Sequence, residues 1–198
     1  MAEAVFARLA AALARPGPAS SDFDLNPGDP PAMPAPTRAA VLIAVEAAPA
    51  GPRLWLTRRA PRMRHHAGQI ALPGGRLDPG DAGPGAAALR EAEEEIGLPR
   101  TSVVILGQLP EHDTVTGFRV APVVGRVTAP FAPIPEPGEV AEVFAVPWDH
   151  VADPANYRVE ARHWRGSDRR YFTLPWGPYY IWGATARILR GLAARLDA

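Results

Sequence analysis

A glycine- and proline-rich loop that leads straight into an acidic helix constrains this chain more than any other stretch. The loop covers residues 73–84 and holds a Gly-Gly pair and a Pro-Gly turn. The helix that follows places three carboxylates in one narrow sector at about 100° per residue, those of Glu91, Glu94 and Glu95. Its opposite side is apolar. One face of this helix is therefore acidic, and the other is predicted to pack on a core.

Three carboxylates this close repel one another, and a pair about 5 Å apart at an effective dielectric of about 20 costs roughly 3 kcal/mol. Arg90 lies four residues before Glu94 and is predicted to pair with it, but one guanidinium does not neutralise three acids. A hard divalent cation does, and oxygen-only ligands suit Mg²⁺ or Mn²⁺ better than zinc. The alternative, a solvated acidic face, does not need the glycines of the loop, which cost backbone entropy.

The same residues resemble a known signature. The run Arg90-Glu91-Ala92-Glu93-Glu94-Glu95-Ile96-Gly97-Leu98, with Gly75 before it, closely resembles the Nudix box of hydrolases that split a diphosphate linked to another moiety. The chain departs from the general pattern at two points, because Asp81 stands where the family has glutamate and the segment from there to Arg90 is one residue longer. The resemblance implies catalytic roles for the arginine and the three acids, with the metal held by Glu91, Glu94 and Glu95.

The stretch before the loop narrows the resemblance to one branch of the family. It reads Leu56-Thr57-x-Arg59-Ala60-x3-Arg64-x3-Gly68-x3-Leu72-Pro73-Gly74-Gly75, which looks like the motif of coenzyme A pyrophosphatases. Trp55 and Leu72 replace a usual Leu and a usual Phe, and both positions stay apolar. The resemblance implies that CoA or acyl-CoA is split into 3′,5′-ADP and 4′-phosphopantetheine or its acylated form.

Two other functions stay open at this point. The chain fits a hydrolase for a related diphosphate such as ADP-ribose or NADH, and it also fits a catalytically silent nucleotide-binding module. Retention of all three box acids argues against the silent module. In either hydrolase, attack by water at phosphorus needs no covalent intermediate, which suits a chain without an obvious nucleophile.

A basic run just before the loop supplies candidate phosphate ligands. Its members are Arg58, Arg59, Arg62, Arg64, His65 and His66. The planar fork of arginine engages phosphate through two bonds, and glycine lets a backbone approach a ligand closely. The predicted substrate-binding residues are Arg59, Arg64, Gly68, Gln69, Gly74 and Gly75. The two histidines are not predicted to bind zinc, because neighbouring side chains point apart.

Glutamates outside the box complete the predicted site. In relatives a glutamate beyond the box often acts as the base, and Glu139 and Glu142 are the candidates here. The alternative for each is an ordinary surface charge. Taken one residue at a time, the pattern slightly favours the surface charge.

Composition excludes several other functions. The formal net charge is zero, so no overall field gathers nucleic acid. The chain has neither cysteine nor lysine, which removes thiolate sites, Schiff-base chemistry and a Walker-type phosphate loop. The N-terminus lacks a long apolar core, so neither a signal peptide nor a membrane anchor is expected. We expect a cytoplasmic enzyme with a small diphosphate substrate, and both a monomer and a homodimer stay open.

The order of the remaining elements predicts an α/β fold. Residues 1–36 are predicted to form a helix over 2–14 and then a proline-rich arm that follows the surface, and residues 37–198 form the hydrolase domain. Strands are predicted at 38–47, 53–59, 69–72, 102–109, 118–127 and 140–146, a hairpin at 157–162 and 170–174, and a last helix at 180–196. These elements agree with the α/β/α sandwich and mixed central sheet that the Nudix resemblance implies.

Overall fold

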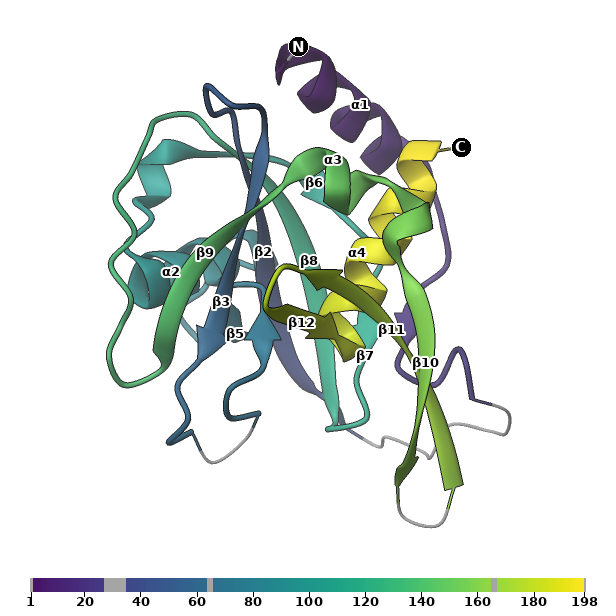
Figure 1. The fold of residues 1–198 in the computed structure, drawn as a ribbon. Helices are drawn as coiled ribbons and strands as arrows, with labels where there is room; N and C mark the ends of the chain where they lie inside the picture. Colours follow the sequence, from purple (N-terminus) through teal and green to yellow (C-terminus); the bar gives the residue numbers. More distant parts are fainter. Residues whose placement is uncertain (1, 27–34, 64–65, 165–166, 198) are drawn as a thin grey trace.

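The chain folds into helices arranged around two β-sheets (Figure 1), as seen in a computed structural model that describes residues 2–26, 35–63, 66–164 and 167–197. The helices are α1 (Ala2–Ala14), α2 (Pro84–Ile96), α3 (Trp148–Ala152) and α4 (Gly183–Asp197), with 3-10 turns at Arg100–Ser102 and Pro154–Asn156. The strands are β1 (Ser20–Ser21), β2 (Thr37–Glu46), β3 (Arg53–Arg59), β4 (Ile70–Ala71), β5 (Gly74–Arg76), β6 (Val103–Gln108), β7 (His112–Asp113), β8 (Phe118–Val127), β9 (Val140–Pro147), β10 (Arg158–Trp164), β11 (Ser167–Trp176) and β12 (Tyr179–Trp182).

The larger sheet is mixed. Within the described ranges it has nine strands on the path β1-β7-β8-β2-β3-β4, with β5 beside β2, β6 beside β8 and β9 beside β3. β2 and β8 are parallel from Thr37↔Phe118 to Glu46↔Val127, whereas β3 runs antiparallel to β2, β4 and β9. The central strands β2 and β8 are buried on both faces, which explains their almost continuous apolar runs.

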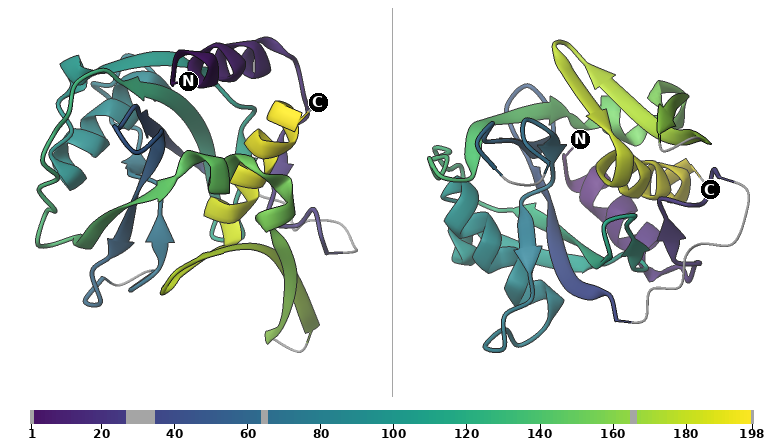
Figure 2. Two further views of the ribbon diagram at one scale, coloured as in Figure 1. Left: turned by 45° about the horizontal axis from the view of Figure 1, so that its top comes forward. Right: turned by 90° about the horizontal axis from the view of Figure 1, so that it is seen from below.

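Helices cover both faces of this sheet. Successive side chains of a strand point to opposite faces, so Leu42 of β2 joins the core under α2 with Ile96. The next residue, Ile43, joins a second core with Leu189 of α4. Figure 2 shows α2 on one side of the sheet and both α1 and α4 on the other. The predicted α/β/α sandwich with a mixed central sheet is thereby confirmed.

The C-terminal segment differs from its prediction. The apolar spacing predicted one helix over residues 180–196, but α4 begins at Gly183, and the residues before it form β12, antiparallel to β11. β12 reads Tyr-Tyr-Ile-Trp, and aromatic and β-branched residues favour strands. Gly183 has a left-handed φ of 63°, a conformation that glycine adopts without strain and that separates the strand from the helix.

The N-terminal arm is anchored on the sheet. β1 pairs in parallel with β7, and the fully buried His112 lies between two arm residues, with Nδ1 at 2.9 Å from Ser20 Oγ and Nε2 at 3.2 Å from Asp22 Oδ1. Further along, Arg187 of α4 donates from Nε to Asp24 Oδ2 at 2.8 Å. The described part of the arm is thus held against the sheet and α4, while residues 27–34 lie outside the described residues.

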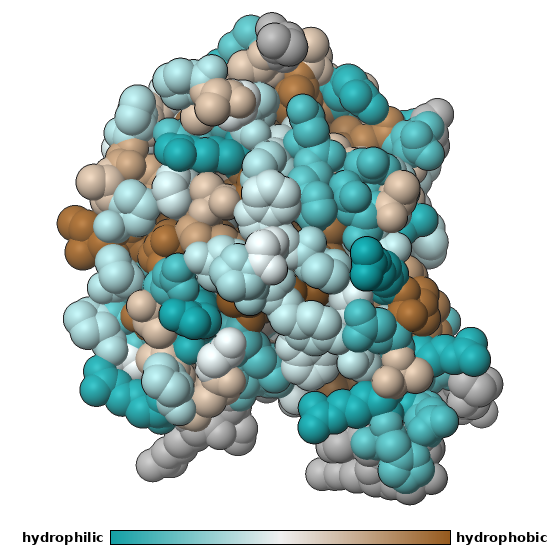
Figure 3. Space-filling view, viewed as in Figure 1, coloured by the Kyte–Doolittle hydropathy of each residue, from teal (hydrophilic) through white to brown (hydrophobic). Residues whose placement is uncertain are grey.

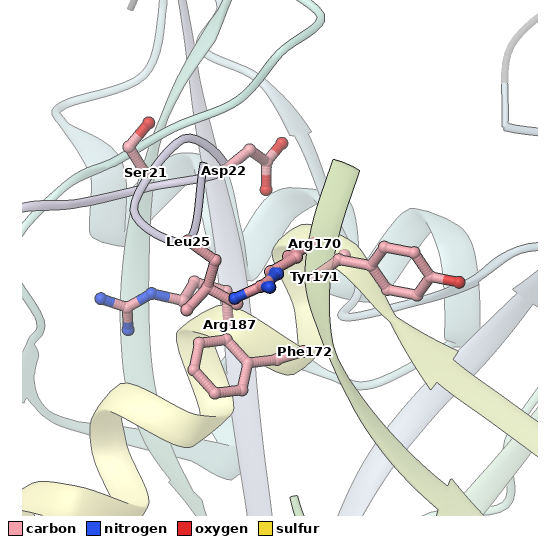
Figure 4. Close-up of a pocket in the computed structure, with 8 residues that line it drawn as sticks. Ser21, Asp22, Leu25, Arg170, Tyr171, Phe172 and Arg187 are labelled. Carbon is pink, nitrogen blue, oxygen red and sulfur yellow. The ribbon is translucent and has the colours of Figure 1, made fainter. Parts of the chain in front are cut away.

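A small pocket marks where the arm meets the C-terminal elements. Figure 4 shows Leu25 of the arm beside Phe172 of β11 and Arg187 of α4. Phe172 also packs against the core under α4. Through Phe172, the arm at Leu25 is therefore connected to that core.

Polar and apolar side chains are interspersed over the face shown in Figure 3. Among the described residues, no helix combines the length and the apolar character that crossing a membrane requires.

We expect Leu9→Ala to destabilise the whole protein and not α1 alone. Leu9 is fully buried in the core under α4, and truncating a buried leucine costs about 2 to 5 kcal/mol. Urea unfolding followed by circular dichroism measures the loss in free energy of unfolding. Leu13→Ala on the same helix, where the side chain is only partly buried, is the matched control and should cost less. A Leu9→Ala protein with the parent's midpoint would show that α1 lies outside the folding unit.

Candidate active site

The acidic helix α2 starts and stops at the residues that its sequence indicates. Pro84 stands in the first turn, where a missing N–H costs no helical bond. Gly97 caps the other end with a φ of 70°, and its N–H donates to the carbonyl of Glu93 at 3.0 Å. Between these ends, Ala88 and Ile96 are buried against the sheet. This packing turns the acidic face toward the loop at residues 73–84.

Glu95 is the most buried carboxylate on that face. Its side chain is 5% exposed, against 16% for Glu91 and 55% for Glu94. The N–H of Gly74 donates to Glu95 Oε2 at 3.1 Å, and Nη1 of Arg59 lies 3.8 Å from Oε1. Burial raises the pKa of Glu95 to about 8, although the Gly74 hydrogen bond and the arginine charge oppose it. A further cation beside this carboxylate would favour its ionised form.

Glu91 lies over the next residue of the loop. A Cβ atom at Gly75 would come within 2.4 Å of Glu91 Oε1, so only glycine fits there without moving the carboxylate. Burial raises the pKa of Glu91, the hydrogen bond from Arg90 lowers it, and nearby acids raise it further. Because Glu95 contacts Gly74 and Glu91 contacts Gly75, the two carboxylates lie side by side over consecutive residues.

Arg90 holds the outer acids together. Its Nη1 donates to Glu91 at 2.9 Å and to Glu94 at 3.1 Å, which confirms the predicted pair with Glu94. Its Nε and Nη2 donate to the two oxygens of Asp81 at 3.1 and 2.9 Å. The hydrogen bonds from Arg90 hold the pKa of Asp81 below its usual range. Asp81, which replaces the family's glutamate, therefore serves here as the partner of the arginine and ties the loop to α2.

The two glutamates predicted as bases lie in different surroundings. Besides burial, the charge of Glu139 raises the pKa of both carboxylates over the loop, so Glu139 lies within electrostatic range of them. Glu142 instead accepts a hydrogen bond from the Tyr179 hydroxyl at 2.6 Å and pairs with Arg58 at 2.9 Å. Of the two, the structure brings Glu139 to the acidic cluster and places Glu142 beside the aromatic strand β12.

The acidic cluster fits a hard divalent cation by its donor types. The buried Glu95 and the half-buried Glu91 offer carboxylate oxygens next to bare glycine backbone. Neither thiol nor imidazole takes part, which suits Mg²⁺ or Mn²⁺. In the part of the chain that the structure describes, no group of three or more acids and histidines already encloses a metal position. Arg90 instead engages Glu91 and Glu94, so binding a cation would redistribute these pairs.

Three of the six predicted substrate-binding residues, Arg59, Gly74 and Gly75, lie around this cluster. Gly74 and Gly75 form its floor, and Arg59 reaches Glu95 from the end of β3. The Nε of Arg59 is buried and has no hydrogen-bond partner among the described residues. Gly68 and Gln69 line a cavity next to β4. Arg64 and His65 lie outside the described residues, and His66 contacts Gln69, with Nδ1 at 2.9 Å from Oε1.

Three aromatic residues beside the site were not predicted from the sequence. Tyr179, Tyr180 and Trp182 of β12 line the same cavity as Gly68 and Gln69. Residues from position 180 onward were assigned to a helix because of their apolar spacing. The aromatic run after the Trp-Gly-Pro turn is the signal that would have indicated a strand.

An α/β/α sandwich in which a glycine-rich loop lies against buried glutamates of the following helix defines the class of Nudix hydrolases. The NUDIX domain profile matches residues 36–167, and the chain belongs to this family. It is therefore a Nudix hydrolase, an enzyme of diphosphate hydrolysis.

Similar curated proteins carry the same family name. The uncharacterized Nudix hydrolase NudL of Klebsiella pneumoniae subsp. pneumoniae is 42% identical over 161 residues, covering 81% of this chain and 83% of that protein. NudL of Citrobacter koseri is 43% identical over 159 residues, covering 80% and 82%. Among solved structures, the Nudix hydrolase RenU of M. smegmatis matches with a TM-score of 0.51 and 29% identity, covering 60% of this chain and 74% of that one.

A second solved structure supports the fold alone. The MutT protein of Methanosarcina mazei Go1 matches with a TM-score of 0.52 and 20% identity, covering 84% of this chain and 96% of that chain. The shared architecture thus extends beyond the residues that the family profile matches.

Proposed function

We propose that this Nudix hydrolase splits the diphosphate of CoA or acyl-CoA with Mg²⁺ or Mn²⁺, through a catalytic domain that spans residues 37–198. Water attacks phosphorus, a new P–O bond forms, and the bond from that phosphorus to the bridging oxygen breaks. The products are 3′,5′-ADP and 4′-phosphopantetheine or its acylated form. The choice of CoA rests on the resemblance of residues 56–75 to the CoA-type motif. The structural observation that supports a substrate contact from this motif is Arg59, whose Nη1 lies 3.8 Å from Glu95 Oε1 and whose buried Nε has no hydrogen-bond partner among the described residues.

Three groups of residues have separate roles in the proposed reaction. Glu91, Glu94 and Glu95 would hold the divalent ion, which would supply polarisation of the diphosphate and a lowered pKa for the attacking water. Arg59 binds phosphate oxygens through its guanidinium. Glu139, which lies within electrostatic range of the buried carboxylates, accepts the proton of the attacking water.

The alternatives differ in substrate and not in site. A hydrolase for ADP-ribose or NADH would use the same acids, and a silent nucleotide-binding module would keep the fold without turnover. The buried Glu95 over Gly74 and the half-buried Glu91 over Gly75 favour a working site. Removing a carboxylate from water costs stability, and a helix with a purely structural role would not need this arrangement.

A substrate panel tests the proposal directly. CoA, acetyl-CoA, dephospho-CoA, ADP-ribose and NADH are compared under one metal condition, and the products are identified by mass. We expect a CoA species to have the highest kcat/KM. If ADP-ribose or NADH exceeds every CoA species, the CoA assignment is wrong while the diphosphate hydrolase stands.

The same panel run on Arg59→Ala tests the phosphate contact. Loss of a charge-assisted hydrogen bond of about 1.5 to 3 kcal/mol should lower kcat/KM by roughly 10- to 150-fold. Arg59→Lys keeps the charge and should recover part of the loss. Arg100→Ala removes an exposed arginine that pairs with Glu93, and as the control it should leave turnover unchanged.

A further inference from the structure

A proline-rich segment joins β8 to β9 and lies against the end of α2. It has prolines at positions 130, 133, 135 and 137, and residues 130–136 form a loop. Figure 1 shows this connection passing beside α2 before β9 begins. Because proline fixes its own φ at about −65°, such a segment loses little conformational entropy on folding. We call residues 130–138 the proline strap, and the residue that follows it is Glu139, the proposed base.

Two backbone hydrogen bonds join the strap to the last turn of α2. The N–H of Ile134 donates to the carbonyl of Ile96 at 3.0 Å, and the N–H of Glu136 donates to the carbonyl of Glu95 at 3.0 Å. The last four carbonyls of a helix find no partner inside the helix, and the strap supplies partners for two of them here. Its second bond goes to the main chain of the most buried carboxylate in the acidic cluster.

An aromatic contact fixes the beginning of the strap. The ring of Phe131 meets the ring of Trp55 edge to face, with centroids 5.1 Å apart and an interplanar angle of 63°. Phe131 packs against the core under α2, and Trp55 is buried in that core. The Ile134 side chain, in contrast, is 69% exposed. The middle of the strap is therefore held by its backbone, and its beginning by a side chain.

The end of the strap turns sharply and fixes the backbone of Glu139. The N–H groups of Glu139 and Val140 both donate to the carbonyl of Glu136, at 3.1 and 2.8 Å. The carbonyl of Glu139 then accepts the N–H of Ala60 at 2.7 Å. The backbone of Glu139 is thus bonded to the strap on one side and to the CoA-type motif on the other.

A β-bulge directly after the strap completes this arrangement. The pairing of β9 with β3 shifts register between Arg58 and Arg59, which leaves Ala141 as an extra residue on β9. Bulges redirect the side chains around them and are frequent beside active sites. The residue opposite the start of β9 is Arg59, whose Nη1 lies 3.8 Å from Glu95 Oε1. Strap and bulge together place Glu139 close to this pair.

We propose that the proline strap is a positioning element that holds Glu139 beside Glu95, and that the N–H of Glu136 makes its decisive contact. The inference rests on the proposed function, in which Glu139 accepts the proton of the attacking water. The Glu139 side chain is exposed, so the fold fixes its place through the backbone. A general base acts only within hydrogen-bond reach of the proton that it takes, and a displacement of about 1 Å can cost about 10²-fold in rate.

Amide exchange in the metal-free protein tests the positioning without turnover. Glu136→Pro removes the N–H that reaches Glu95, whereas Glu136→Ala keeps it. NMR-detected hydrogen exchange should be about 2- to 10-fold faster at the Ile134 and Ala60 amides of Glu136→Pro, the range that one lost hydrogen bond gives. Glu136→Ala should restore the protection of the parent. If both amides of Glu136→Pro keep that protection, the strap does not depend on this bond and the inference is wrong.

A second variant decides the question if Glu136→Pro does not melt cooperatively. Phe131→Ala removes the ring contact with Trp55 and leaves every backbone N–H in place. It should accelerate exchange at the same two amides, and Phe131→Tyr, which keeps the ring, should not. Parent-like exchange at Ala60 in Phe131→Ala would then overturn the inference.

Kinetics test whether the strap acts through Glu139. On any diphosphate that is turned over, Glu136→Pro should lower kcat by about 10- to 100-fold and leave KM and the calorimetric Mn²⁺ affinity unchanged. Glu139→Gln should lower kcat by about 10²- to 10⁴-fold. The double variant should be no slower than Glu139→Gln, because a positioning residue has no effect once its target is gone. If the two losses multiply, or if Glu136→Pro weakens Mn²⁺ binding without changing exchange at Ala60, the strap does not serve Glu139.

The same measurements separate this inference from the proposed function. If no diphosphate in the panel is turned over, the proposed function fails, and exchange at Ala60 still decides whether the strap holds Glu139. If a diphosphate is turned over and Glu139→Gln keeps the kcat of the parent, the inference fails while the hydrolase stands. If ADP-ribose is the best substrate and the double variant behaves as expected, the CoA assignment fails and the inference stands.

Discussion

Glu95→Gln should abolish diphosphate hydrolysis while leaving the fold intact. The Glu95 side chain is 5% exposed and accepts the Gly74 N–H at 3.1 Å, and a glutamine side chain preserves both the volume and this hydrogen bond. The substitution removes the charge that we propose holds the cation. Removing one preorganised electrostatic group from an active site costs about 10²- to 10³-fold in kcat. Steady-state turnover at saturating Mn²⁺ measures the loss.

Metal binding provides the readout that does not depend on activity. Calorimetric titration with Mn²⁺ should show weaker binding to Glu95→Gln and to Glu91→Gln than to the parent. Glu93→Gln is the matched control, because Glu93 lies on the same helix, is exposed and pairs with Arg100 at 2.7 Å. If the two variants fold and bind Mn²⁺ as tightly as the parent, these carboxylates are not the ligands.

A chain that ends at Pro178 should fail to fold. The truncation removes β12 and α4, whose large buried side chains are Ile181, Ile188, Leu189 and Leu192. Each is worth about 1.5 to 3 kcal/mol when buried, and together they approach the whole stability of a typical domain, about 5 to 15 kcal/mol. Far-UV circular dichroism during heating should show no cooperative transition.

Two point variants test the same packing of α4 without shortening the chain. Leu192→Ala, at a position 1% exposed, should lower the free energy of unfolding by about 2 to 5 kcal/mol. Leu196→Ala, where the side chain is only partly buried against the same core, should cost less. If the shortened chain melts cooperatively near the parent's temperature, the sheet and α2 are sufficient for folding without β12 and α4.

Local sequence patterns were enough to predict the elements that depend on neighbouring residues alone. The strand predicted at residues 118–127 is β8, and α2 lies between the Pro84 and Gly97 signals, because short-range turn chemistry and the period of apolar residues set both. The pair of Arg90 with Glu94 follows from helical spacing alone. The sandwich itself followed from the order of such elements and from the resemblance to the Nudix box.

Contacts between distant segments decided the rest. Residues 180–182 have helical apolar spacing but form a strand because β11 offers an edge to pair with, and this pairing moves Tyr180 to a cavity wall. Glu139 and Glu142 are three residues apart in one stretch, yet only the pairing of β9 with β3 sets Glu142 opposite Arg58 and leaves Glu139 near the acids. The sequence thus determined which residues carry charge and where helices begin, whereas strand pairing, which depends on long-range register, decided which charges meet.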